Sequence, residues 1–209
     1  MRWVTQKSPN RFVCRPLSAI ARSRAPWWRG GLFALLACAT GQSLAQPVQQ
    51  GAAAISLEYA VKATYLYKLA PFVNWPPSEF ATADAPFRIC VAGEDPFGDY
   101  LKNAVAGRGL GRHRFQVQRL DAAASATGCQ ILFLGRLPAQ GAGQVLDAVS
   151  GKPVLTVVDS ATPHVGGIVQ FVIESGRVRF EIDTAAAARN HITISSKLLN
   201  LALAVKDRP

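Results

Sequence analysis

The sequence predicts an α/β fold, with a single domain in which helices flank a mixed parallel and antiparallel sheet, and with a late β-hairpin and a C-terminal helix. Short apolar segments of strand length alternate with helical segments between residues 55 and 158, as in parallel βαβ units. Strands at 168–174 and 177–183 flank Ser175-Gly176, a dipeptide typical of a hairpin turn. A hairpin beside parallel strands makes the sheet mixed.

The first element is a helix over 55–73, which is rich in helix-forming residues. Glu58 and Lys62 stand at i,i+4 spacing, which favours an ion pair on the helix. Pro76-Pro77 is expected to end the segment, because proline removes a hydrogen-bond donor. One helical stripe is expected to be buried, and it comprises Leu57, Val61, Tyr65, Leu69 and Phe72.

The middle of the chain alternates strands with helices. We expect strands at 87–92, 113–120, 130–135 and 153–158, and helices at 95–106 and 144–149. Asp95 is expected to cap the first of these helices, with Pro96 at its first position. The glycine-rich run 107–111 follows a helix rather than a strand. It is therefore interpreted as a turn and not as a dinucleotide-binding loop.

The C-terminal third begins with the hairpin. In its second strand Val178, Phe180 and Ile182 alternate with charged side chains, which predicts one buried and one exposed face. A short helix is expected at 185–189. Ser195 is expected to cap a final helix at 196–205, whose apolar side chains require burial.

Residues 1–45 are predicted to be a signal peptide. They contain seven basic and no acidic residues, and the apolar run 31–40 is too short to span a membrane, which takes about 20 residues. Ser43 and Ala45 occupy the −3 and −1 positions of a cleavage site before residue 46. The alternatives are an uncleaved anchor and a lipid anchor at Cys38. The expected location is the periplasm.

The net charge of +10 comes mainly from this leader. Residues 46–209 contain 16 basic and 13 acidic residues, a net charge of +3. No nucleic-acid partner is expected, because nucleic-acid binding needs a concentrated basic face on the folded domain. We expect a flexible lead-in at 46–54 and one α/β domain at 55–206.

The cysteines predict a disulfide. Cys14 and Cys38 lie in the leader, so the exported chain would retain one pair, Cys90 and Cys129, each beside a strand-like run. If those strands are neighbours, the Cα atoms can approach within the roughly 4.4–6.8 Å that a disulfide needs. The alternative is a pair of free buried thiols.

Most of the common catalytic motifs are absent from the sequence. It has no Gly-x-Ser-x-Gly elbow and no phosphate-binding loop, so the protein is not expected to be an enzyme. None of the three histidines has a second possible metal ligand at close spacing: His113, His164 and His191. We therefore expect neither a metal ion nor any other cofactor. Asp95, Asp159 and Asp183 lie near element ends, where capping and turns explain them.

Four residues are candidates for binding a partner. Tyr67 and Trp75 belong to an aromatic segment, and such rings supply large contact areas at interfaces. Arg177 and Arg179 form an exposed row on the hairpin. The alternatives are core packing for the aromatic rings and an ordinary solvated face for the arginines.

Several long runs in the same order resemble the YfiR family of small periplasmic proteins. The runs are EYAVKATYLYKLAPFVNWP (58–76), FRICVAGEDPFG (87–98), GCQILFLG (128–135), GKPVLTVVDS (151–160) and GGIVQFVIESGRVRFEID (166–183), followed by ISSKLLNLA (194–202). The resemblance implies an α/β fold and a tendency to form a homodimer. Cys90 and Cys129 match the pair that forms the family's core disulfide, whereas the family's second disulfide has no counterpart here.

The resemblance also implies a regulatory function. The protein would repress an inner-membrane signalling protein, a diguanylate cyclase in the first instance, by binding its periplasmic domain, and would thereby control cyclic-di-GMP and biofilm formation. The alternative is a periplasmic small-ligand binding or sensor module that acts on another membrane receptor. Its ligand would bind at the carboxyl ends of the parallel strands, near 93–98, 135–138 and 159–167.

Overall fold

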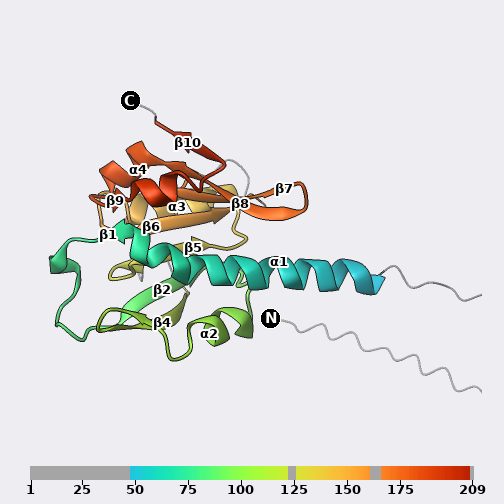
Figure 1. The fold of residues 1–209 in the computed structure, drawn as a ribbon, viewed down its shortest axis with the longest axis horizontal. Coiled ribbons are helices and arrows are strands. Elements are labelled where there is room, and N and C mark those ends of the chain that lie inside the picture. Colours follow the sequence, from blue (N-terminus) through green and yellow to red (C-terminus); the bar gives the residue numbers. More distant parts are fainter. Residues whose placement is uncertain (1–47, 122–125, 161–165, 208–209) are drawn as a thin grey trace, which may run out of the picture. The chain divides into compact units, whose positions relative to one another are not determined.

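The computed structural model describes residues 48–121, 126–160 and 166–207 (Figure 1). The expected signal peptide, the Cys38 alternative and His164 lie outside these residues. The strands are β1 (Val73–Asn74), β2 (Phe87–Ala92), β3 (Gly109–Leu110), β4 (His113–Leu120), β5 (Ile131–Leu134), β6 (Leu155–Asp159), β7 (Val169–Glu174), β8 (Arg177–Asp183), β9 (Thr193–Ile194) and β10 (Ala204–Lys206). The helices are α1 (Val48–Leu69), α2 (Asp99–Val105), α3 (Ala139–Ala148), α4 (Thr184–Arg189) and α5 (Ser196–Leu199), and short 3₁₀ turns cover Ala70–Phe72 and Pro77–Glu79.

The predicted mixed sheet is confirmed. Eight strands pair in the order β10-β8-β7-β6-β5-β2-β4-β3, while β1 and β9 form a separate two-stranded ribbon. Strands β4, β2, β5, β6 and β7 run parallel to one another. The hairpin adds β8 antiparallel to β7, and β10 then pairs parallel to β8 at the sheet edge. Strands β2, β4 and β8 have the expected bounds.

Helices cover both faces of the sheet (Figure 1). On β2, Phe87, Ile89 and Val91 belong to the larger hydrophobic core, which also contains buried residues of α1 and α2. The alternate residues Cys90 and Ala92 belong to a second core under α3. Burial on both faces explains why the central strands are nearly continuous apolar runs.

The predicted disulfide between Cys90 and Cys129 is confirmed. Cys90 lies on β2 and Cys129 precedes β5, and these two strands are hydrogen-bonded neighbours. The two Cα atoms are 5.9 Å apart. Both side chains are buried in the core under α3, so the disulfide is an internal cross-link of the sheet.

Helix α1 differs from the prediction at both ends. It begins at Val48, inside the stretch expected as a lead-in, and ends at Leu69 rather than at residue 73. Pro71 has no amide hydrogen to continue the α-helical ladder, so the chain passes into a 3₁₀ turn. Val73 and Asn74 then pair with β9 instead of extending the helix.

The buried stripe of α1 was predicted only in part. Leu69 is buried and Tyr65 and Phe72 are half-buried, whereas Leu57 and Val61 are exposed. The side chains that face the sheet include Lys62, Ala63, Leu66 and Ala70. Apolar residues lie on two sides of this helix, and packing on the sheet selects one of them.

Helices α2 and α3 begin at other positions than predicted. Asp95 does not cap a helix, because its Oδ1 accepts a hydrogen bond from the amide of Phe97 at 2.8 Å within a turn. Helix α2 follows Gly98, whose positive φ of 52° lets the chain change direction there. Helix α3 begins at Ala139, directly after Pro138 and five residues before the expected start at 144.

The C-terminal helix is confirmed but shorter than predicted. The Ser195 hydroxyl caps α5 by accepting from the amide of Leu198, and the helix ends at Leu199. Residues 204–206 form β10 because the adjacent half of β8 offers backbone hydrogen-bonding groups there. Asp183 caps α4, with Oδ1 accepting from the amide of Ala186 at 2.7 Å.

Candidate functional site

An apolar groove runs between the outer face of α1 and the tip of the β7–β8 hairpin. We call it the helix–hairpin groove, and its volume is about 630 Å³. It is lined by Leu57, Glu58, Val61, Tyr65, Ile173, Gly176, Arg177, Val178 and Arg179. Two of the four predicted partner-binding residues, Arg177 and Arg179, therefore lie together in a concave surface.

The groove exists because the hairpin extends beyond the strands that flank it (Figure 1). Strand β6 pairs with β7 only over residues 169–171, and β10 pairs with β8 only over residues 181–183. The hairpin tip beyond these positions pairs only with itself, through the register partners Ile173 and Val178. These two side chains lie on the same sheet face as Phe171 and Phe180, whose rings pack on Tyr65 of α1.

Large apolar side chains are exposed in this groove. The exposed fractions are 68% for Leu57, 37% for Val61 and 45% for Ile173. Tyr65 and Val178 are half-buried between them. Contiguous exposed apolar surface with a polar rim marks interaction sites, whereas single exposed apolar residues are normal on any protein.

The rim of the groove is mainly basic. Arg177 and Arg179 line the hairpin side, and Lys68 lines an adjoining hollow on α1 that shares Val61 and Tyr65 with the groove. Glu58 also lines the groove, but its carboxylate forms an ion pair with the buried Lys62.

A buried ion pair links α1 to strand β6 of the sheet. The Lys62 side chain is fully buried, and its Nζ lies 2.7 Å from Oδ2 of Asp159, which is 3% exposed. Asp159 ends β6. Our explanation of Asp159 by capping or a turn is therefore wrong. Lys62 must face Asp159, and this orientation of the helix turns Leu57 and Val61 outward.

The Lys62–Asp159 pair also affects Tyr59, whose ring lies 4.8 Å from Lys62 Nζ. Burial raises the pKa of Tyr59 to about 12, and the negative charge of Asp159 adds to the shift. The folded state therefore holds the phenolic proton more tightly than the unfolded chain, whose pKa is 10.0. The stability that Tyr59 contributes should be complete below pH 10 and should decrease as the pH rises toward 12.

Ultraviolet titration of the phenolates at 295 nm checks this expectation. We expect one late step near pH 12 that is missing in Tyr59→Phe. Tyr67→Phe is the matched control and should retain the late step. A wild-type curve with no step beyond that of ordinary tyrosines, whose pKa is about 10, would contradict the assignment.

Tyr67 and Trp75 lie elsewhere. The Tyr67 ring packs 6.1 Å from that of Phe115 on β4, and the Arg108 guanidinium lies 5.4 Å from it. Trp75 packs edge-on against Phe87 at 5.0 Å, and its indole Nε1 is buried without a hydrogen-bond partner among the described residues. Both rings are half-buried. They pack on residues of β4 and β2, so the structure does not bring them together with the two arginines.

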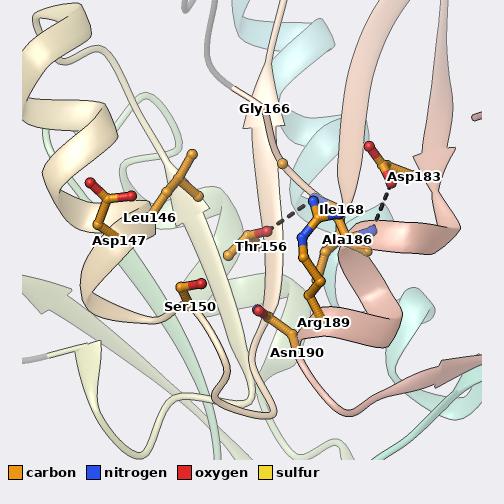
Figure 2. Close-up of a pocket in the computed structure, with 11 residues that line it drawn as sticks. Leu146, Asp147, Ser150, Thr156, Gly166, Ile168, Asp183, Ala186, Arg189 and Asn190 are labelled. Carbon is orange, nitrogen blue, oxygen red and sulfur yellow. Dashed lines mark hydrogen bonds between the residues drawn. The ribbon is translucent and has the colours of Figure 1, made fainter. Parts of the chain in front are cut away.

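A second hollow lies between α3 and α4 (Figure 2). It has a volume of about 250 Å³. Figure 2 shows Asp147 and Ser150 on one side, and Arg189 and Asn190 on the other. Asn190 is buried and donates to the carbonyl of Val154 at 2.9 Å.

This hollow does not lie where we expected a ligand. Gly166 and Gly167 line it and belong to one of the loops expected to bind a ligand. However, the pocket opens at the amino ends of β6 and β7, since it includes Thr156 and Ile168. At the carboxyl ends of β2 and β5, the amide of Glu94 bonds to the carbonyl of Arg136 and ties the two loops together.

Within the described ranges, the helices are too short or too polar to cross a bilayer. Among the same residues, no cluster of three or more His, Cys, Asp or Glu side chains could hold a metal ion.

The fold is that of an α/β domain whose mixed sheet is cross-linked by an internal disulfide. The family model of the YfiR/HmsC-like proteins matches residues 59–203, and the chain belongs to this family. The match begins near the start of the groove-lining part of α1 and extends past α5, so it includes almost all of the described domain. The family comprises periplasmic regulators of cyclic-di-GMP signalling.

Proposed function

We propose that this protein is exported to the periplasm, where it binds the periplasmic domain of an inner-membrane diguanylate cyclase and keeps the enzyme inactive. The helix–hairpin groove carries this proposal, because it gathers Leu57, Val61 and Ile173 on an accessible surface beside two arginines. Aromatic and arginine side chains are enriched at protein interfaces, and the fully buried core of an interface is more apolar than the rest of the surface. The protein acts by binding, without catalysis and without a cofactor.

Cellular cyclic-di-GMP tests this function. Deletion of the gene is expected to raise the nucleotide several-fold and to increase biofilm, and the exported wild-type protein should restore both. An Arg177→Glu/Arg179→Glu variant should fail to restore them, because it reverses the charge of the groove rim. The measurement is nucleotide quantification by mass spectrometry, with immunoblots to show equal periplasmic amounts.

The matched control reverses two other arginine charges near the opposite edge of the sheet. Arg112 precedes β4 and Arg114 is the second residue of that strand; both are exposed and have the same spacing as Arg177 and Arg179. Arg112→Glu/Arg114→Glu should repress like the wild type. Equal repression by both double variants would remove the groove from the proposal, and an unchanged nucleotide level after deletion would refute the function itself.

A small-ligand sensor is the second candidate function. The hollow between α3 and α4 favours it, because Arg189 and Asp147 there could hold the charged groups of a small molecule (Figure 2). The two functions differ in a simple respect. A sensor would be stabilised by its ligand in the absence of any protein partner.

The homodimer implied by the family would use a different surface from the groove. The chain has a second set of exposed apolar residues near the edge strand β10: Leu201, Leu203 and Val205. Pairing of β10 with its copy would satisfy the free backbone groups of this edge. We propose this edge as the dimer contact, which leaves the helix–hairpin groove free for the partner.

A further inference from the structure

We infer that the helix–hairpin groove binds an acidic amphipathic helix of its protein partner. The inference rests on the proposed function of the groove as the docking site and names the chemistry of what enters it. Three properties of the groove support this inference: the backbone of its walls, the spacing of its apolar side chains and the charge of its rim.

The walls of the groove favour a helical occupant over an extended one. One wall is α1, whose backbone groups are already bonded within the helix. The other wall presents the side chains of Ile173 and Val178, because these residues are paired to each other within the hairpin. Across the floor of the groove an extended segment would therefore meet side chains rather than backbone groups, whereas a helix satisfies its own backbone hydrogen bonds.

The spacing on α1 indicates the size of the occupant. Leu57, Val61 and Tyr65 recur every fourth residue, and Lys68 follows at the end of the adjoining hollow. The distance along α1 from Leu57 to Lys68 is roughly 16 Å at the 1.5 Å rise of an α-helix. About three turns of a second helix would cover it, with apolar residues at i, i+3 or i+4, and i+7.

The charges on the rim indicate an acidic partner. Lys68, Arg177 and Arg179 are the basic groups, and Glu58 is the acidic residue that lines the groove, while Glu174 lies nearby at the end of β7. Glu58 is already paired with Lys62. Glu174 is the register partner of Arg177 across the hairpin. The cations of the rim therefore outnumber its acidic groups, and Lys68 and Arg177 are exposed where acidic residues of a partner can reach them.

The same charges argue against a second copy of this chain in the groove. A symmetric dimer would place equal patches against each other, since both subunits contribute the same surface. The net positive rim of one protomer would then lie against the net positive rim of its partner. Like charges brought together at an interface oppose its formation.

Site-specific photo-crosslinking in the deletion strain tests the inference. The exported full chain carries Val61→p-benzoylphenylalanine or Ile173→p-benzoylphenylalanine, and the crosslinked segment is identified by peptide sequencing. Both positions are expected to capture one segment of a membrane protein, with helical apolar periodicity and net negative charge. A synthetic peptide of this segment should gain helical circular dichroism on binding the purified protein.

Two controls accompany the experiment. Gln116 is exposed on β4, so Gln116→p-benzoylphenylalanine should not capture the segment. Adding Arg177→Glu/Arg179→Glu should lower the crosslinking yield roughly tenfold or more, whereas Arg177→Lys/Arg179→Lys should largely keep it.

The inference is overturned if the captured segment is basic, extended or lacking an apolar stripe, if it comes from a second copy of this chain, or if nothing is captured while the protein still represses. These outcomes leave the proposed function intact whenever the wild-type protein lowers cyclic-di-GMP. Conversely, capture of an acidic helix from a protein without a cyclase domain supports the inference and refutes the proposed function.

Discussion

Lys62→Met is expected to destabilise the folded protein by about 3–5 kcal/mol. The substitution keeps an apolar stem of similar length but leaves Asp159, which is 3% exposed, without the cation that lies 2.7 Å away. A buried carboxylate without its cation must remain as an uncompensated charge or take up a proton, and both cost free energy. Denaturant unfolding of the oxidised mature protein measures the change.

Two variants identify the cause. Lys68→Met removes an exposed lysine from the same helix and should change the free energy of unfolding by less than about 0.5 kcal/mol. Lys62→Met/Asp159→Asn removes both charges and should be more stable than Lys62→Met alone. If Lys62→Met were as mild as Lys68→Met, the ion pair would not be what holds α1 on the sheet.

Loss of the disulfide is the second large effect. Cys90→Ala/Cys129→Ala is expected to lower the free energy of unfolding by about 4 kcal/mol on the chain-entropy relation, within a usual range of 2–5 kcal/mol. The bond closes a loop with a sequence separation of 39 residues and constrains the unfolded chain accordingly. Both cysteines are also buried, so the alanines leave unfilled space under α3.

Reduction separates these two contributions. The wild-type protein in dithiothreitol loses the cross-link but keeps its sulfur atoms in the core, so it should be more stable than the double alanine variant. The stability of the variant itself should not respond to the reductant. A wild-type protein whose unfolding is the same with and without reductant would show that the disulfide contributes nothing to stability.

Local patterns were sufficient to predict the central strands and the hairpin. Strand β2 is an apolar run because both of its faces are buried, and β8 alternates because its positions alternate between the core and a wetter face. Ser175 and Gly176 both have positive φ, as the two-residue turn between β7 and β8 requires. These features depend on neighbours in sequence, so the pattern alone reveals them.

Helix ends were harder to predict, because they depend on partners outside the local segment. Residues 196–205 are apolar enough for a helix, but β8 offers a free edge at residues 181–183 and takes residues 204–206 as a strand. Asp95 has the right side chain for a cap, but it closes a turn before Gly98 instead. Of the candidate site, the sequence identified Arg177 and Arg179 but not the apolar residues beside them.

The sequence by itself therefore determined the α/β class, the mixed sheet with its hairpin, the cysteine pair and the family. Only the tertiary structure decided which side of α1 faces the sheet, and with it the existence of the groove. The rotation of a helix about its axis depends on what it packs against. Here Lys62 meets Asp159, which is 97 residues away in the chain, and this contact leaves Leu57 and Val61 on the surface.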